Sequence, residues 1–262
     1  METELIQVDW LNVLVGLGLV AVAIGLSYFN GLGLERDIIV GTIRCIVQLA
    51  ILGYALVYLF RLQCMWVIVL ILLGMAFVAA LTAKGRMKRP YPGTIPILWF
   101  SIAVGSFFAL AYVTVITMAD PLALTARYII PLGGMAIGNT LNGISLAAER
   151  FRSELESQRD RVEVLLSMGA DASRAAAEPA RAAVAAGMIP TINALMVIGL
   201  VQIPGVMTGQ ILSGADPLVA ARYQLIIMFM LVGGKVIALT LALRLAVKRY
   251  FTPEHQLRRE LL

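Results

Sequence analysis

Charge, histidine and cysteine are all scarce in this sequence, and each shortage excludes a class of protein. Only 14% of the 262 residues are charged, while 60% are hydrophobic; soluble domains carry roughly a quarter charged residues. The single histidine, His255, excludes a His-Glu-x-x-His zinc site. The two cysteines, Cys45 and Cys64, are too few for a disulfide framework. The composition is that of a membrane protein.

Catalytic and nucleotide-binding patterns are missing as well. The chain has no G-x-x-x-x-G-K-[ST] phosphate loop, because Gly233-Gly234-Lys235 lacks the upstream glycine. No Asp or Glu falls inside a long apolar run, which leaves neither a proton relay in the membrane nor a base for a nucleophile. We therefore expect no enzyme activity and no cofactor in this chain.

Long apolar runs are what the chain does have. A helix of about twenty residues crosses the roughly 30 Å of hydrocarbon in a bilayer. Runs that are apolar on every side favour helices over a β-barrel, whose strands alternate. The sequence predicts an all-α polytopic transmembrane bundle, a single domain over residues 1–262. The seven expected spans are 11–29, 38–60, 64–82, 95–118, 128–148, 189–208 and 223–246.

The distribution of Lys and Arg predicts the topology. With the N-terminus outside, 16 of the 21 basic residues fall on inner segments and 3 on outer ones. Inner segments are enriched in Lys and Arg, so we predict an outer N-terminus and a cytoplasmic C-terminus. The net charge of +5 then belongs to a basic cytoplasmic face beside the lipid bilayer, and no nucleic-acid partner is expected.

The inner connection at about 149–188, between spans five and six, is long and charged. Apolar residues recur along it at helical spacing: Phe151, Leu155, Val162, Leu165 and Leu166. This spacing predicts an amphipathic helix. Gly169 is expected to end it, and Asp171 to cap a second helix, while Pro179 is expected to kink the Ala-rich stretch that follows. The sequence predicts a cytoplasmic helix–turn–helix on which another protein docks.

One motif in this connection predicts what docks there. Importer-type ABC permeases carry a cytoplasmic helix reading Glu-Ala-Ala, three residues and then Gly, and Glu163 and Gly169 have that spacing. The downstream Ile-x-Leu-Pro is absent, and Pro179 stands where its Ile would be. A short helix ended by glycine fits a cleft on an ATPase and transmits its motion. The residues predicted to couple to the ATPase are Glu163, Leu166, Ser167, Gly169 and Ala170; a solvated loop is the alternative.

The chain also resembles a known family over nearly its full length. The residues that carry the resemblance are 35–38, 44, 48, 130–135, 138–139, 166–170, 188–191, 199–209, 214–217 and 222–224. They are similar to the FetB-type ABC permeases, bacterial iron exporters with plant relatives linked to aluminium tolerance. The resemblance implies a multi-pass inner (plasma) membrane permease that exports iron or another small solute. It further implies a homodimer of this chain working with a separately encoded cytoplasmic ATPase, which binds the ATP and Mg.

Polar residues in the predicted spans are candidates for the translocation pathway: Arg44, Gln48, Asn139, Asn142, Gln202 and Lys235. Such residues usually face the bundle interior or a watery cavity. Each has a structural alternative. Arg44 could clamp Glu35 or Glu149, and Lys235 could snorkel or cap carbonyls. The asparagines could pack the fifth span against its neighbours, beside the small residues Gly134 and Gly138.

Pro190, Pro204 and Gly205 are predicted to break the sixth span. Broken helices often mark a gate or a substrate site, and simple kinking is the alternative. The twelve methionines are expected to pack the core rather than bind a soft metal. The sequence assigns no metal ligands.

The residues and the resemblance disagree on the substrate. Iron is a hard cation that favours carboxylates or histidines, which the predicted spans lack, whereas Arg44 and Lys235 favour an anion. The open alternatives are an anionic iron chelate, a metal held by carbonyls, amides and Cys45, and an anionic metabolite such as a nucleotide sugar. A membrane scaffold or regulatory protein that transports nothing, and a secondary carrier, are the rival classes.

Overall fold

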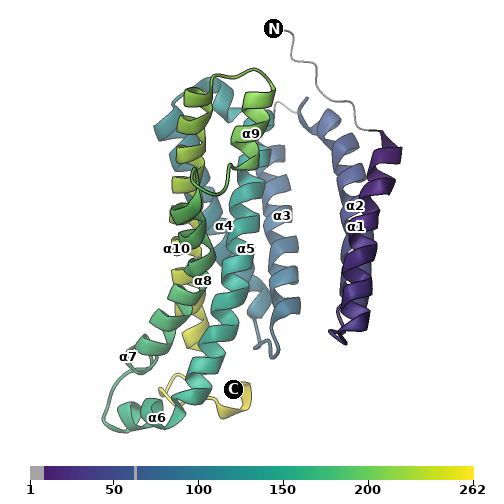
Figure 1. The fold of residues 1–262 in the computed structure, drawn as a ribbon. Coiled ribbons are helices and arrows are strands. Elements are labelled where there is room, and N and C mark those ends of the chain that lie inside the picture. Colours follow the sequence, from purple (N-terminus) through teal and green to yellow (C-terminus); the bar gives the residue numbers. More distant parts are fainter. Residues whose placement is uncertain (1–8, 62–63) are drawn as a thin grey trace. The chain divides into compact units, whose positions relative to one another are not determined.

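The computed structural model describes residues 9–61 and 64–262, and the regular elements of these residues are helices. The α-helices are α1 (Trp10–Phe29), α2 (Glu35–Leu59), α3 (Met65–Arg86), α4 (Thr94–Ala111), α5 (Ala126–Ser157), α6 (Arg159–Ser167), α7 (Ala172–Ala175), α8 (Ala177–Val197), α9 (Gly205–Leu212) and α10 (Pro217–Tyr250) (Figure 1). A π-helical piece, Tyr112–Met118, continues α4, and short 3₁₀ turns lie at Pro121–Leu124 and Arg259–Leu261. The predicted all-α class is confirmed.

The chain divides into two compact units, residues 1–62 with 212–214 and residues 63–211 with 215–262. In the first unit α1 and α2 form a hairpin. Its turn uses two glycines, Gly31 and Gly33, at φ of +62° and +69°, where other residues are strained. The Ser27 hydroxyl donates to Glu35 Oε1 at 2.7 Å and accepts from the Leu34 amide at 3.1 Å. These bonds hold the start of α2 against the end of α1.

In the second unit α5 packs against α3, α4, α8 and α10. Glycines allow two of these helices to approach others closely. A Cβ atom on Gly105 of α4 would lie 2.4 Å from the Gly234 carbonyl oxygen of α10, and one on Gly187 of α8 would lie 2.8 Å from the Gly143 carbonyl oxygen of α5. Small residues at helix crossings are the usual packing device inside membranes.

Six helices are long and apolar enough to cross a membrane: α1, α2, α3, α4 with its π-helical extension, α8 and α10. The predicted fifth span, which corresponds to α5, is not among them. Its asparagines and glycines lower its hydropathy, and its four neighbouring helices shield much of it from lipid. A helix that is covered by other helices does not need an all-round apolar surface.

The sixth span differs from the prediction at both ends. A helix was expected over 189–208, but α8 runs from Ala177 to Val197 and residues 198–204 are not helical. The Ala-rich stretch supplies the first half of α8, and Gly199, at φ +80°, lies in the turn that follows its end. Pro190 does not break the helix, which is continuous through it, and Pro179 lies in its first turn rather than at a kink. Proline is tolerated in the first turn because those N–H groups have no helical acceptor.

Candidate functional site

The segment from the end of α5 to the start of α8 folds as the sequence predicts at its turn. Gly169 follows α6 with φ +87°. Its amide donates to the Leu166 carbonyl, and the Ala170 amide donates to the Leu165 carbonyl, both at 3.0 Å. This is a Schellman C-cap. Asp171 then caps α7, accepting from the Arg174 amide at 2.7 Å, so the expected glycine stop and aspartate cap are both confirmed.

The helical segment has a buried and an exposed face. Phe151, Leu155 and Val162 are buried and Leu165 and Leu166 are half-buried, so the predicted apolar face is confirmed in part, although it is divided between α5 and α6. Val164 of α6 and Met168, the C-cap residue directly after it, are four residues apart and are instead 55% and 78% exposed. We call this pair the α6 ridge. This exposed pair could not be predicted from the sequence, because apolar residues at this spacing look the same whether they face a core or solvent.

Glu163 is held by two arginines. Arg159 Nε donates to its Oε1 at 2.9 Å, and Arg259 grips both carboxylate oxygens, with Nε at 2.9 Å and Nη2 at 2.7 Å. The hydrogen bonds from Arg159 and Arg259 lower the pKa of Glu163 below its ordinary 4.5. The carboxylate therefore stays ionised at neutral pH, and its ion pairs are lost only in acid below 4.5. Arg259 is 96 residues away in the sequence, so no local pattern could have identified it.

The C-terminal tail, residues 251–262, folds back onto this segment. The His255 Nδ1 atom accepts from the Ala172 amide at 3.3 Å, at the start of α7. Between the tail and α6 lies an open hollow of about 440 Å³ lined by Glu163, Leu166, Ser167, Glu254, His255, Gln256, Leu257 and Arg259. Three of the predicted coupling residues, Glu163, Leu166 and Ser167, thus line a surface depression that the tail completes.

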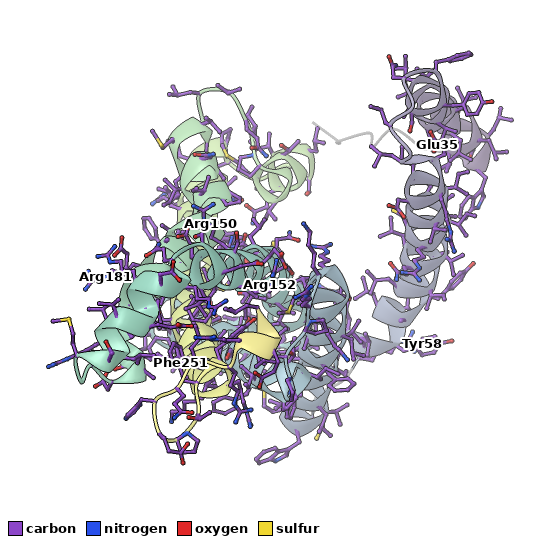
Figure 2. All side chains as sticks on the ribbon, turned by 90° about the horizontal axis from the view of Figure 1, so that it is seen from below. Glu35, Tyr58, Arg150, Arg152, Arg181 and Phe251 are labelled. Atoms are coloured by element: carbon purple, nitrogen blue, oxygen red, sulfur yellow. The ribbon has the colours of Figure 1, made fainter. Side chains whose placement is uncertain are left out.

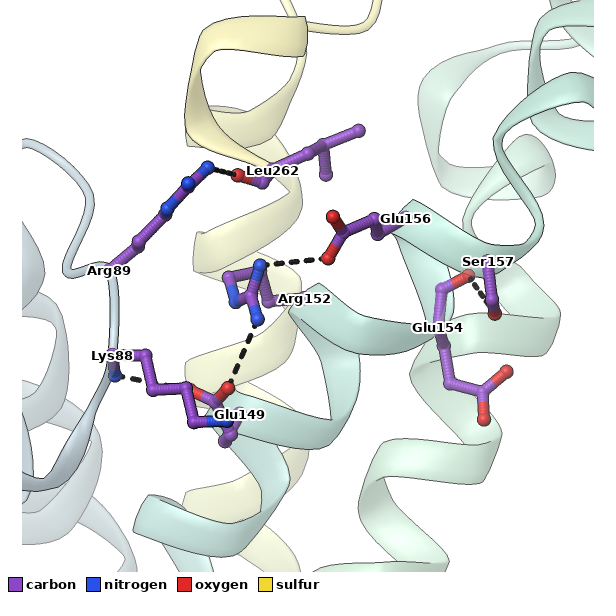
Figure 3. Close-up of polar contacts among 8 residues, drawn as sticks. All are labelled: Lys88, Arg89, Glu149, Arg152, Glu154, Glu156, Ser157 and Leu262. Carbon is purple, nitrogen blue, oxygen red and sulfur yellow. Dashed lines mark hydrogen bonds and ion pairs between the residues drawn. The ribbon is translucent and has the colours of Figure 1, made fainter.

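Glu149 connects the same end of the unit to the α3–α4 connection (Figure 3). Its Oε1 pairs with Arg152 Nη2 at 3.2 Å, and its Oε2 accepts from the Lys88 amide at 3.3 Å. Arg152 also pairs with Glu156 at 2.9 Å. Figure 2 looks onto this end of the chain, where Arg150, Arg152 and Arg181 are labelled. Glu149 and Arg152 fix the last turns of α5.

Two predicted pathway residues, Lys235 and Asn139, belong to one hydrogen-bond network. Lys235, in the middle of α10, is fully buried, and its Nζ donates to the Thr191 hydroxyl of α8 at 2.7 Å. The Thr191 hydroxyl donates to Asn139 Oδ1 of α5 at 3.4 Å, and Asn139 Nδ2 donates to the Leu231 carbonyl at 3.5 Å. The network joins three helices. Thr191 was missed because a threonine in a helix carries no distinctive sequence signal.

The remaining pathway candidates lie elsewhere. Asn142 is exposed and accepts from Arg86 Nη1 at 2.9 Å, at the end of α3. Arg44 and Gln48 are exposed on α2 in the first unit. Glu35, the proposed clamp for Arg44, is bonded to Ser27 instead. Gln202 is exposed in the turn after α8, where its carbonyl accepts from the Gly199 amide at 2.9 Å.

Of the predicted break residues, Pro204 and Gly205 coincide with a helix start. The Pro204 carbonyl accepts from the Thr208 amide at 2.9 Å, and Gly205 is the first residue of α9. As for metals, no group of three His, Cys, Asp or Glu residues that could hold an ion occurs within residues 9–61 and 64–262. Met188, Met228 and Met230 are buried, whereas Met65, Met168 and Met196 are exposed, so the expectation that the methionines pack the core holds for only part of them.

Relatives of this chain are membrane proteins. Residues 10–251 match the family described as "Uncharacterised protein family (UPF0014)". A UPF0014 membrane protein of Synechocystis is 37% identical over 256 residues, covering 98% of each chain. "Probable iron export permease protein FetB" of Escherichia coli is 32% identical and covers 91% of each chain. "Protein ALUMINUM SENSITIVE 3" of Arabidopsis thaliana is 30% identical over 91% of this chain and 86% of its own. No solved structure matches.

These matches confirm the resemblance drawn from the sequence motifs, and they cover both units of the fold. With its six apolar helices of membrane-spanning length, this chain is a multi-pass membrane protein that belongs to the UPF0014 family, together with the bacterial FetB permease and its plant relatives.

Proposed function

We propose that this chain is the permease subunit of an ABC transporter that exports a small solute, driven by a separate ATPase subunit. The observation that carries the proposal is the α6 ridge, because Val164 and Met168 are exposed at the end of a short helix that Gly169 terminates. The name of the Escherichia coli relative, a permease, supports the same role. Two copies of this chain would work with two ATPases, which bind the ATP and Mg.

The proposed coupling is mechanical. An ATPase cleft that receives the α6 ridge buries two apolar side chains, which favours association. α6 follows α5 directly at Gln158, and its Arg161 pairs with Glu178 at the start of α8 at 2.5 Å. A displacement of α6 therefore reaches two helices of the bundle. The helix bundle would then have two arrangements, and the ATP-bound ATPase needs only to bind one of them more tightly than the other.

For the cargo, we propose iron carried as an anionic chelate. Iron is named for the FetB relative. The part of the chain described by the structure holds no cluster of metal-ligating side chains, and the Lys235 ammonium in α10 would repel a free cation. An anionic metabolite such as a nucleotide sugar is the second candidate, because the same lysine favours it. In the structure Lys235 is enclosed, so it could meet cargo only when α5, α8 and α10 separate.

The test is ATPase activity in liposomes that contain this chain and its candidate ATPase. We expect wild-type chain to stimulate hydrolysis and the Met168→Glu variant to lose most of the stimulation, since a carboxylate replaces an apolar contact. The matched control is Leu218→Glu. Leu218 is also an exposed apolar residue, but it lies in the first turn of α10, at the end of that helix that is distant from the C-terminal tail and α6. Fe(II), iron chelates and nucleotide sugars are then added to the assay one at a time. The solute that raises ATP hydrolysis further is the cargo.

A scaffold protein would give a different result. If the ATPase binds this chain but no solute alters hydrolysis or crosses the bilayer, transport is rejected and the scaffold class remains. If the ATPase neither binds nor responds, the permease proposal itself is wrong.

A further inference from the structure

The C-terminal tail is an ordered element with its own hydrogen bonds. The Thr252 amide donates to the Gln256 carbonyl at 2.8 Å, and the Arg258 amide donates to the Tyr250 carbonyl at 2.8 Å. Phe251 and Leu262 are both buried. These contacts fold residues 251–262 into a compact hairpin that continues α10.

The hairpin is attached to three other elements. Arg259 binds both carboxylate oxygens of Glu163 on α6. His255 accepts from the first amide of α7. Arg89, from the α3–α4 connection, donates to the main-chain oxygen of Leu262 (Figure 3). The tail therefore links the coupling segment and the α3–α4 connection to the end of α10.

The base of the tail is tightly packed where it leaves α10, and Tyr250 is buried there. The Tyr250 ring packs edge-on against Tyr91 and against Phe151 of α5, with ring centroids 5.4 and 5.6 Å apart. Aromatic pairs in this arrangement are favourable beyond simple burial. A displacement of the tail should therefore displace α10 as well.

We infer that the C-terminal tail ties α6 to α10, and that Arg259 is the positioning residue that holds Glu163 and the α6 ridge in place for the ATPase. The inference rests on the proposed function. The tail flanks α6 rather than covering it, because Val164 and Met168 stay exposed and the hollow between tail and helix stays open. The tail therefore supports the α6 ridge from the side and leaves it accessible to the ATPase.

Through the tail, a movement of α6 caused by the ATPase could also reach the centre of the bundle. α10 carries the tail at one end and Lys235 in its middle, where Lys235 bonds to α8. Movement of α6 would then pull on α10 through Glu163 and Arg259, in addition to acting on α5 and α8. The tail makes α6 and α10 move together.

The experiment compares Arg259→Gln with Arg258→Gln, a neighbouring arginine for which the structure records no side-chain bond within residues 9–61 and 64–262. Both full-length variants are placed in nanodiscs and titrated with the ATPase. Arg259→Gln should weaken ATPase binding about fivefold, the upper range for a surface ion pair, and raise amide exchange in both 159–170 and 251–262. Arg258→Gln should match wild type in both measurements.

Charge reversal separates positioning from simple loss of a charge. The Glu163→Arg, Arg259→Glu double variant should recover part of the binding that either single variant loses. Equal melting temperatures of the two glutamine variants would show that the bundle remains folded.

The outcomes separate this inference from the proposed function. If wild-type chain binds the ATPase but Arg259→Gln behaves as Arg258→Gln does, the tie is wrong and the permease role stands. If Arg259→Gln tightens binding, the tail is an autoinhibitory cover and the inference is overturned. If wild-type chain does not bind, the proposed function fails, while the exchange data still decide whether Arg259 holds the tail on α6.

Discussion

At the residue scale, Lys235 is a buried cation with a neutral partner. The end of the Lys235 side chain lies against Gly143, where a Cβ atom would be 2.0 Å from Lys235 Cε. The Lys235 Nζ atom donates a hydrogen bond to the Thr191 hydroxyl. Burying an ammonium group is costly unless it is hydrogen-bonded. Thr191 is thus the residue that makes Lys235 tolerable, and Gly143 is the residue that makes room for it.

This arrangement predicts an asymmetry between two substitutions. Thr191→Val keeps the shape of the side chain but leaves the lysine without that acceptor, so it should destabilise the protein by about 1–3 kcal/mol. Lys235→Met removes both the charge and the need for a hydrogen-bond acceptor. The Thr191→Val, Lys235→Met double variant should therefore be more stable than Thr191→Val alone. Thermal unfolding of the purified protein in detergent measures both. Equal stability of Thr191→Val and wild type would show that the bond has no energetic weight.

At the element scale, the crossing of α4 and α10 depends on two glycines. A Cβ atom on Gly234 would lie 3.0 Å from both the Gly105 carbonyl oxygen and the Ala109 Cβ, whereas one on the adjacent Gly233 would meet nothing within 4 Å. Gly105 and Gly234 therefore set the distance between the two helices, whereas Gly233 does not and can serve as the control position.

We expect Gly105→Ala to destabilise the bundle by about 1–3 kcal/mol, because the new methyl group would overlap the backbone of α10. Gly233→Ala should be neutral or stabilising by up to about 1 kcal/mol, since alanine favours helix. Melting temperatures in detergent are the measurement. A loss at position 233 as large as that at 105 would indicate that glycine flexibility, and not helix proximity, matters in this region.

Elements set by local chemistry could be predicted from the sequence. The end of α6 and the start of α7 follow from Gly169 and Asp171, whose effects act within a few residues. The start of α8 could not be predicted as well, because Ala and Gly are weakly apolar and the stretch before 189 looks like a soluble helix. The Glu163–Arg259 pair and the Lys235–Thr191 bond join distant segments, and no spacing rule reveals such contacts.

At the scale of the whole molecule, α5 determines how many times the chain crosses the membrane. Its 32 residues would extend about 48 Å at 1.5 Å per residue, more than a bilayer core requires. Four helices pack against it, and its charged residues from Glu149 onward lie at the end that carries α6. A central helix of this kind can cross without being strongly apolar, and the distribution of Lys and Arg then favours an outer N-terminus.

The crossing predicts opposite accessibility for the two ends of α5. In a chain with Cys45→Ala and Cys64→Ala, Leu122→Cys before α5 should react with an impermeant maleimide in intact cells, because it lies outside. Ser157→Cys at the last residue of α5 should react only after the membrane is permeabilised. Both positions are exposed, so permeabilised cells give full labelling as the control. If both cysteines react from one side, α5 does not cross, the chain has six spans, and the two termini must lie on the same side of the membrane; the ATPase could then reach α6 only if that side is the cytoplasm.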